Sequence, residues 1–177
     1  MVMRRAAPTE GPRTYSRDMT DEAASRRKAQ LERFATGFAA VADALEGASD
    51  DDLDRRGPSG GWSAREVAHH LADSESMAYV RLRRLIAEDD PIIAGYDEPE
   101  WARRLHYERP IETSIEVLRA VRGASQQLLM ALTADEWARR GTHSESGQYS
   151  VDDWLGIYAA HSHDHADQIR RARRGEG

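Results

Sequence analysis

Four segments of this chain repeat apolar residues at intervals of three and four, and this periodicity is the feature that most restricts the fold. Such intervals match the 3.6-residue period of an α-helix and place the apolar side chains on one face. The segments run from about 20 to 45, from 63 to 87, from 112 to 132 and from 150 to 174. No segment shows the strict alternation of a convincing β-strand. The pattern therefore predicts an all-α protein that folds as a four-helix bundle.

Short sequence signals mark the boundaries of these helices. Ser63 followed by Glu66 has the spacing of a capping box, which begins the second helix. Pro91 and Pro110 bound a long irregular connection between helices 2 and 3, in which we expect a short helix over residues 100–105. Three other segments are interpreted as connections, namely loops at 48–61 and 141–147 and a capped turn at 133–136.

The length of 177 residues is typical of a single domain. Residues 1–18 contain prolines at positions 8 and 12 and no apolar period, so we expect a flexible N-terminal tail before one bundle domain over residues 19–177. The net charge of −6 argues against a nucleic-acid partner. The sequence shows neither a secretory signal nor an apolar run of the roughly 18 residues that cross a membrane. We therefore expect a cytoplasmic protein without a membrane partner.

Three of the seven histidines are predicted to face the interior of the bundle. At about 100° per residue, His70 lies at the edge of the apolar face of its helix. His161 and His165 lie four residues apart on the apolar side of the last helix. The other four histidines are predicted to be exposed at the surface: His69, His106, His143 and His163.

The positions of the three inward histidines suit a single metal ion. Two imidazoles at i and i+4 and a third from a facing helix can bind one cation. The chain has no cysteine, which excludes thiolate metal sites and a cysteine nucleophile. Neutral imidazole suits zinc, nickel, copper and iron(II) alike, and three protein ligands leave a position open for water or substrate. The alternative is that these histidines are partly buried and hydrogen-bonded without a metal.

Two polar residues are candidates for a role beside the metal. Asp97 lies in the long connection, where its carboxylate could face a substrate or a ligand histidine. Gln168 follows His165 by about one helical turn and could hydrogen-bond a ligand histidine or a water molecule. The alternatives are an acid that faces water and a polar edge of the bundle. Glu66 is explained by helix capping, so we do not choose it as a general base.

Three segments of the chain resemble the motifs of the DinB-like superfamily. The first runs from Trp62-Ser63 through Glu66 to His70-Leu71-Ala72-Asp73, the second contains Gly95-Tyr96-Asp97-Glu98 before Trp101, and the third is the HxxxH from His161 to His165. The resemblance covers about residues 25 to 173. It implies up-down-down-up connectivity of the bundle, frequent dimerisation, and a divalent nickel or zinc ion held by His70, His161 and His165.

The resemblance also implies a class of reaction. Family members are described as metal-dependent hydrolases, and related ones use low-molecular-weight thiols, including bacillithiol S-transferases and mycothiol-dependent isomerases. It therefore implies a metal-dependent enzyme, assembled as a homodimer, that acts on a small-molecule substrate. Of the two reactions, we prefer S-transfer with a low-molecular-weight thiol as cofactor over hydrolysis. The non-enzymatic alternative is a stress-linked metal-binding bundle protein.

Overall fold

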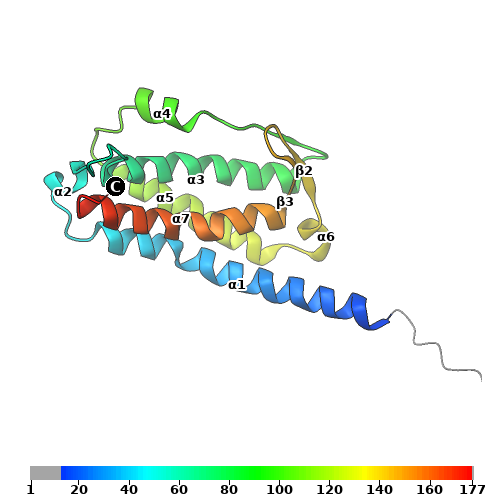
Figure 1. Ribbon diagram of the computed structural model, residues 1–177. Coiled ribbons are helices and arrows are strands. Elements are labelled where there is room, and N and C mark those ends of the chain that lie inside the picture. The colour runs from blue at the N-terminus through cyan, green and yellow to red at the C-terminus, as the bar shows by residue number, and fades with distance from the viewer. Residues whose placement is uncertain (1–12, 177) are drawn as a thin grey trace, which may run out of the picture.

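Four long helices form the body of the protein in the computed structural model, which describes residues 13–176 and their side chains from residue 22 onward. These helices are α1 (Arg13–Leu45), α3 (Ala64–Ala87), α5 (Glu112–Ala131) and α7 (Val151–Arg173). Figure 1 shows that α1 and α7 run in one direction and that α3 and α5 run in the other. The predicted all-α bundle with up-down-down-up connectivity is therefore confirmed. No helix within residues 13–176 has the length and hydropathy needed to span a membrane.

The long connection between α3 and α5 follows from the parallel course of these two helices. Because α3 ends at the opposite end of the bundle from the start of α5, the chain must travel back along the whole bundle. It does so through the short strand β1 (Ile92–Ile93) and the helix α4 (Glu98–Arg104), the second of which is labelled in Figure 1. The short helix expected at 100–105 is thus present and begins two residues earlier. Its position places the connection over the outer side of α3.

A small sheet closes the end of the bundle at which α3 ends and α7 begins. Strand β2 (Arg140–His143) pairs antiparallel with β3 (Gly147–Ser150) and parallel with β1. The interpretation of residues 141–147 as a loop was therefore wrong. Each strand has at most four residues, which is too short to show an alternation of apolar and polar residues in the sequence. Gly147 follows the tight turn between β2 and β3 and has a φ of +81°, a conformation that favours glycine.

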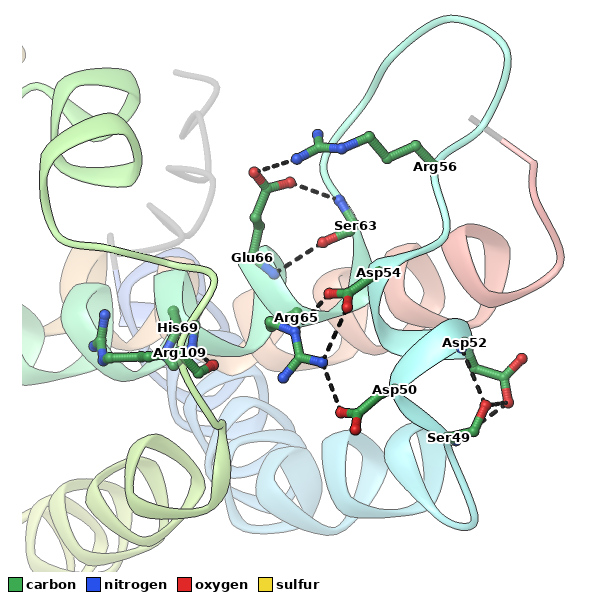
Figure 2. Close-up of polar contacts among 10 residues, drawn as sticks. All are labelled: Ser49, Asp50, Asp52, Asp54, Arg56, Ser63, Arg65, Glu66, His69 and Arg109. Carbon is green, nitrogen blue, oxygen red and sulfur yellow. Dashed lines mark hydrogen bonds and ion pairs between the residues drawn. The ribbon is translucent and has the colours of Figure 1, made fainter.

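Two short helices lie at the ends of the bundle. Helix α6 (Ala134–Trp137) is the predicted capped turn, with a capping box between Thr133 and Glu136. Helix α2 (Asp50–Asp54) lies in the segment predicted to be a loop, so that prediction was wrong as well. Four of its five residues are acidic, so its sequence shows no apolar period. The helix is stabilised by the buried Arg65 of α3, which donates hydrogen bonds to Asp54 at 2.6 Å and to Asp50 at 2.8 Å, as Figure 2 shows.

The first helix begins earlier than the sequence predicts. The expected flexible tail covered residues 1–18; residues 1–12 lie outside the described part of the chain, and residues 13–18 belong to α1. Figure 1 shows that this end of α1 extends beyond the other helices. A helix already formed can continue past its packed part because each added residue gains one backbone hydrogen bond. An apolar period therefore does not mark this boundary.

The core consists of two apolar clusters with polar side chains between them. One cluster surrounds the fully buried Trp154, whose ring lies 5.5 Å from that of Phe34 and whose Nε1 donates to the Ala78 carbonyl at 2.9 Å. The other cluster includes Leu71 and Ile169 near the opposite end. Buried polar residues of α3, α5 and α7 lie between the two clusters: Ser74, Glu75, Arg122, Ser125 and Ser162.

Candidate metal centre

The structure brings together the three histidines that the sequence singled out. His70 comes from α3, and His161 and His165 come from the antiparallel helix α7. One ring nitrogen of each lies within 4.8 Å of one from each of the others. The ring centroids of His161 and His165 are 4.6 Å apart, and that of His70 lies 4.8 Å from that of His165. His70 is buried and the other two are half-buried, so the cluster reaches the surface on the α7 side.

A buried carboxylate fixes the orientation of His161. The Nδ1 of His161 lies 3.3 Å from Oε1 of Glu75, and Glu75 is only 2% exposed. A carboxylate oxygen accepts hydrogen bonds, so Nδ1 carries the proton and donates it to Glu75. The lone pair of the neutral ring is then on Nε2. This arrangement of a carboxylate behind a histidine is common around metal ligands, where it fixes the tautomer.

Gln168 has the same effect on His165. Its Oε1 accepts a hydrogen bond from Nδ1 of His165 at 2.7 Å, which leaves Nε2 of that ring unprotonated. The neighbouring aromatic rings add packing: Trp62 lies 4.9 Å from His70 and Tyr158 lies 5.6 Å from His161, measured between ring centroids. The ligand nitrogens of two rings are therefore set by hydrogen bonds, and the cluster is bounded by aromatic side chains.

Burial and the neighbouring imidazoles disfavour protonation of His70 and His165. Burial, together with the neighbouring His165 and His161, lowers the pKa of His70 to about 3. Burial and His161 lower the pKa of His165 to about 4, against the opposing hydrogen bond from Gln168. Both rings are consequently neutral at pH 7. Neutral nitrogen donors converging from two helices fit a borderline divalent ion such as zinc or nickel.

Glu75 is also paired with a buried cation. Arg122 of α5 is 3% exposed, and its Nη1 donates to Glu75 at 2.5 Å while its Nη2 donates to the Phe34 carbonyl at 2.6 Å. Ser162 donates to the same carboxylate at 3.2 Å. Burial lowers the pKa of Arg122, and the charge of Glu75 opposes that shift. The carboxylate of Glu75, which accepts from His161, is therefore itself fixed by hydrogen bonds from Arg122 of α5 and Ser162 of α7.

Neither Glu75 nor Arg122 was predicted from the sequence to be part of this site. The signal for Arg122 was its position on the same face of α5 as Leu118 and Leu129, where a charged residue requires a partner. The signal for Glu75 was weaker, because an acid five residues after His70 is turned away from it along the same helix. Only the pairing of α3 with α5 and α7 shows what Glu75 contacts.

Asp97 and Glu66 have structural explanations. The exposed carboxylate of Asp97 accepts a hydrogen bond from the backbone N–H of Glu100 at 2.9 Å and caps α4. Glu66 accepts from the backbone N–H of Ser63 at 2.9 Å and forms an ion pair with Arg56 at 2.6 Å, as Figure 2 shows. The capping interpretation of Glu66 is confirmed.

The prediction that His69 faces solvent was wrong. His69 is fully buried, with Nδ1 at 2.8 Å from Oγ of Ser114 and Nε2 at 2.9 Å from the carbonyl oxygen of Arg109. Figure 2 shows His69 pointing toward the backbone of Arg109. The physical reason is that α3 is covered on two sides, by α7 on one and by α5 with the returning connection on the other. A helix of this kind has no solvent face at that position.

The other three histidines differ in exposure. His106 is exposed, as predicted, and lies 3.0 Å from a carboxylate oxygen of Glu108. His163 is half-buried rather than exposed, since its Nε2 lies 2.9 Å from the Arg33 carbonyl of α1. His143 is also half-buried, because its ring packs 5.5 Å from that of Tyr149 across the hairpin. Full exposure was therefore wrong for two of the three, and the cause in each case is a neighbouring element that the helix pattern does not show.

Comparison with known protein families matches residues 30–169 to the DinB superfamily. The chain belongs to the DinB superfamily. A relative from Oceanobacillus iheyensis, named "Putative metal-dependent hydrolase OB0782", is 41% identical over 121 residues, which are 68% of this chain and 70% of the relative. A "Putative metal-dependent hydrolase" from Bacillus cereus strain 03BB102 is 27% identical over 164 residues, or 93% of each chain.

A solved structure has the same architecture. It is that of YfiT from Bacillus subtilis, described as "a probable metal-dependent hydrolase with an unusual four-helix bundle topology". The TM-score is 0.78 at 27% sequence identity, and the match covers 97% of this chain and 95% of YfiT. The DinB fold of this chain therefore extends over nearly its whole length.

Proposed function

We propose that this DinB protein is a hydrolase of small molecules that depends on a divalent ion, zinc or nickel, held by His70, His161 and His165. The observation that carries the proposal is the convergence of three ring nitrogens within 4.8 Å of one another from two helices. The names of the relatives support the same class of reaction. When bound, a divalent ion with an open coordination position supplies Lewis-acid activation of water and substrate.

The residues of this chain have distinct roles in the proposal. The three histidines bind through neutral nitrogens, and the lowered pKa values of His70 and His165 keep them ready to do so at neutral pH. Glu75 and Gln168 are positioning residues that hold the protons of His161 and His165 on Nδ1. Asp97 is assigned no catalytic part, because its carboxylate caps α4.

Metal analysis of protein purified without an affinity tag is the first test. We expect about one zinc or nickel ion per chain, and no ion after the substitution His161→Ala. His163→Ala is the matched control, because His163 lies on the same helix but hydrogen-bonds to α1. Equal loss of metal from both variants, or wild-type protein that binds no divalent ion, would refute the proposed site.

Turnover assays distinguish the reactions. Hydrolysis at the metal centre predicts that zinc- or nickel-loaded protein cleaves members of a panel of chromogenic amides without any thiol and that a chelator abolishes this activity. Thiol transfer, the reaction preferred from the family resemblance, predicts conversion of an electrophile such as 1-chloro-2,4-dinitrobenzene only when a low-molecular-weight thiol is added. A metal-binding protein without catalytic function predicts neither. Only the first result supports the proposal.

A further inference from the structure

A second polar cluster lies on a different side of α3 from the metal centre, because consecutive residues of a helix lie about 100° apart. It consists of the side chains of His69 and Ser114 and the carbonyl group of Arg109. The Nδ1 of His69 lies 2.8 Å from Oγ of Ser114, and Nε2 lies 2.9 Å from the Arg109 oxygen. Neither side chain takes part in the proposed metal centre. Figure 2 shows how the backbone of Arg109 comes next to His69.

The carbonyl group determines which ring nitrogen of His69 carries the proton. A carbonyl oxygen only accepts hydrogen bonds, so Nε2 of the neutral ring must be the donor to Arg109. Nδ1 is then unprotonated and can only accept. The hydroxyl of Ser114 is the donor in that contact, and its proton points at the lone pair of His69. A serine hydroxyl bonded to an imidazole whose other nitrogen is fixed by a third group is the arrangement of an activated nucleophile.

Ser114 borders a cavity of suitable size. The cavity has a volume of about 490 Å³ and also touches Asp73, Arg109 and Val117. This volume is in the range of small-molecule sites. Ser114 is 7% exposed and lines the cavity, whereas His69 is 0% exposed, so its imidazole and its bond to the Ser114 hydroxyl are shielded from water. Asp73 is already engaged, since the Tyr107 hydroxyl donates to it at 2.7 Å.

The backbone around Ser114 provides donors for a developing negative charge. Ser114 is the third residue of α5, a helix of 20 residues. The first N–H groups of a helix have no partner within the helix. Among the described residues, no side chain caps this end of α5. These N–H groups and the positive end of the helix dipole are therefore available to stabilise an oxyanion formed at Ser114.

We propose that Ser114 and His69 form a second, metal-independent active site that hydrolyses small carboxylic esters. Oγ of Ser114 attacks the carbonyl carbon while its proton passes to Nδ1 of His69. The bond to the leaving oxygen breaks, and that oxygen takes the proton from His69 and departs as an alcohol. Water then attacks the acyl-serine with His69 again accepting the proton; the carboxylic acid leaves and the proton returns to Oγ. The carbonyl of Arg109 is the positioning group.

Covalent labelling in the presence of a chelator tests this site separately from the metal centre. Wild-type protein in excess EDTA is incubated with a fluorophosphonate probe, and the adduct is measured by intact mass and located by peptide sequencing. We expect one probe per chain, attached to Ser114, and p-nitrophenyl acetate hydrolysis that EDTA does not remove. No adduct, or an adduct on another residue, would overturn the proposal.

Four variants sharpen the experiment. Ser114→Ala is expected to abolish labelling, whereas Thr113→Ala, which removes the adjacent exposed hydroxyl, should label within about twofold of wild type. His69→Asn should slow labelling by about a hundredfold or more, the usual contribution of a general base. His161→Ala should label like wild type even though it lacks the proposed metal. If His69→Asn fails to fold, as judged by circular dichroism, adduct location in wild type and Ser114→Ala decides the question.

Discussion

Gly37 of α1 occupies a position where an added methyl group has an unusual effect. Gly37 is buried in the middle of the helix, where glycine normally weakens a helix. Replacing such a glycine by alanine ordinarily stabilises a protein by about 1 kcal/mol. At Gly37, however, the new Cβ would lie 2.5 Å from Nη2 of Arg122 and 3.0 Å from Cβ of Ser162. The close approach of the Arg122 guanidinium to the α1 backbone therefore requires glycine here.

The expected magnitude follows from what the guanidinium would lose by moving. Overpacking a buried site costs about 1–3 kcal/mol. A shift of Arg122 would also weaken its bonds to the Phe34 carbonyl and to Glu75, and breaking a buried ion pair outright costs about 3–5 kcal/mol. After the gain in helix propensity is subtracted, we expect Gly37→Ala to lower the free energy of unfolding by about 2 kcal/mol. Because Glu75 also holds His161, metal affinity should fall in the same variant.

Urea unfolding of the metal-free protein measures this effect, and the chain offers a matched control. Gly123 lies in the middle of α5 and is exposed, and a Cβ added there would meet no atom of a neighbouring segment within 4 Å. Gly123→Ala should therefore raise the free energy of unfolding by about 0.5–1 kcal/mol and leave metal affinity unchanged. If Gly37→Ala proves as stable as Gly123→Ala, then Arg122 does not pack against α1 as described and the reasoning is refuted.

Three further predictions concern the metal centre and its surroundings. Gln168→Leu should weaken zinc or nickel binding by about tenfold or more in competition with a chromophoric chelator, and unchanged affinity would show that its bond to His165 is dispensable. Metal-free protein should lose stability as the pH falls below about 6.5, because the unfolded chain then takes up protons at His70 and His165. The folded-state pKa values of about 3 and about 4 leave both rings largely neutral near pH 5. The free energy of unfolding should therefore change by about 2.5 kcal/mol per pH unit there through these two histidines, as measured in urea titrations, and a pH-independent midpoint would contradict it. Glu66→Ala should cost about 1 kcal/mol of stability as a lost helix cap while retaining full metal content, and loss of the metal would instead implicate Glu66 in the site.

The architecture and the histidine cluster could be predicted because both depend on helical periodicity. A period of 3.6 residues decides which side of a helix is apolar, and the same arithmetic decides that His161 and His165 lie on one side of α7. The length of the connection between α3 and α5 was visible as a break in that period. The hairpin and helix α2 were not visible, because strands of four residues and a helix of five acidic and apolar residues contain too few positions to show any period.

His69 shows why periodicity fails where a helix is enclosed. Its angular position opposite the apolar face predicts contact with water, which holds only if that side of α3 is uncovered. In this topology the parallel course of α3 and α5 brings the returning chain across that side, and the Arg109 carbonyl needs a donor once it is buried there. A histidine supplies that donor and an acceptor for Ser114 at once.

The polar residues at the junction of the two apolar clusters explain why the candidate metal centre is where it is. A buried carboxylate such as Glu75 is tolerated only when its charge is balanced and its oxygens accept hydrogen bonds. Arg122 provides the charge, and Ser162 and His161 provide further donors from α7. These partners lie on two different helices, so the carboxylate can be satisfied only when α3, α5 and α7 are packed in register. The interactions that orient His161 are therefore the same ones that specify how the bundle packs, and a change that loosens one must loosen the other.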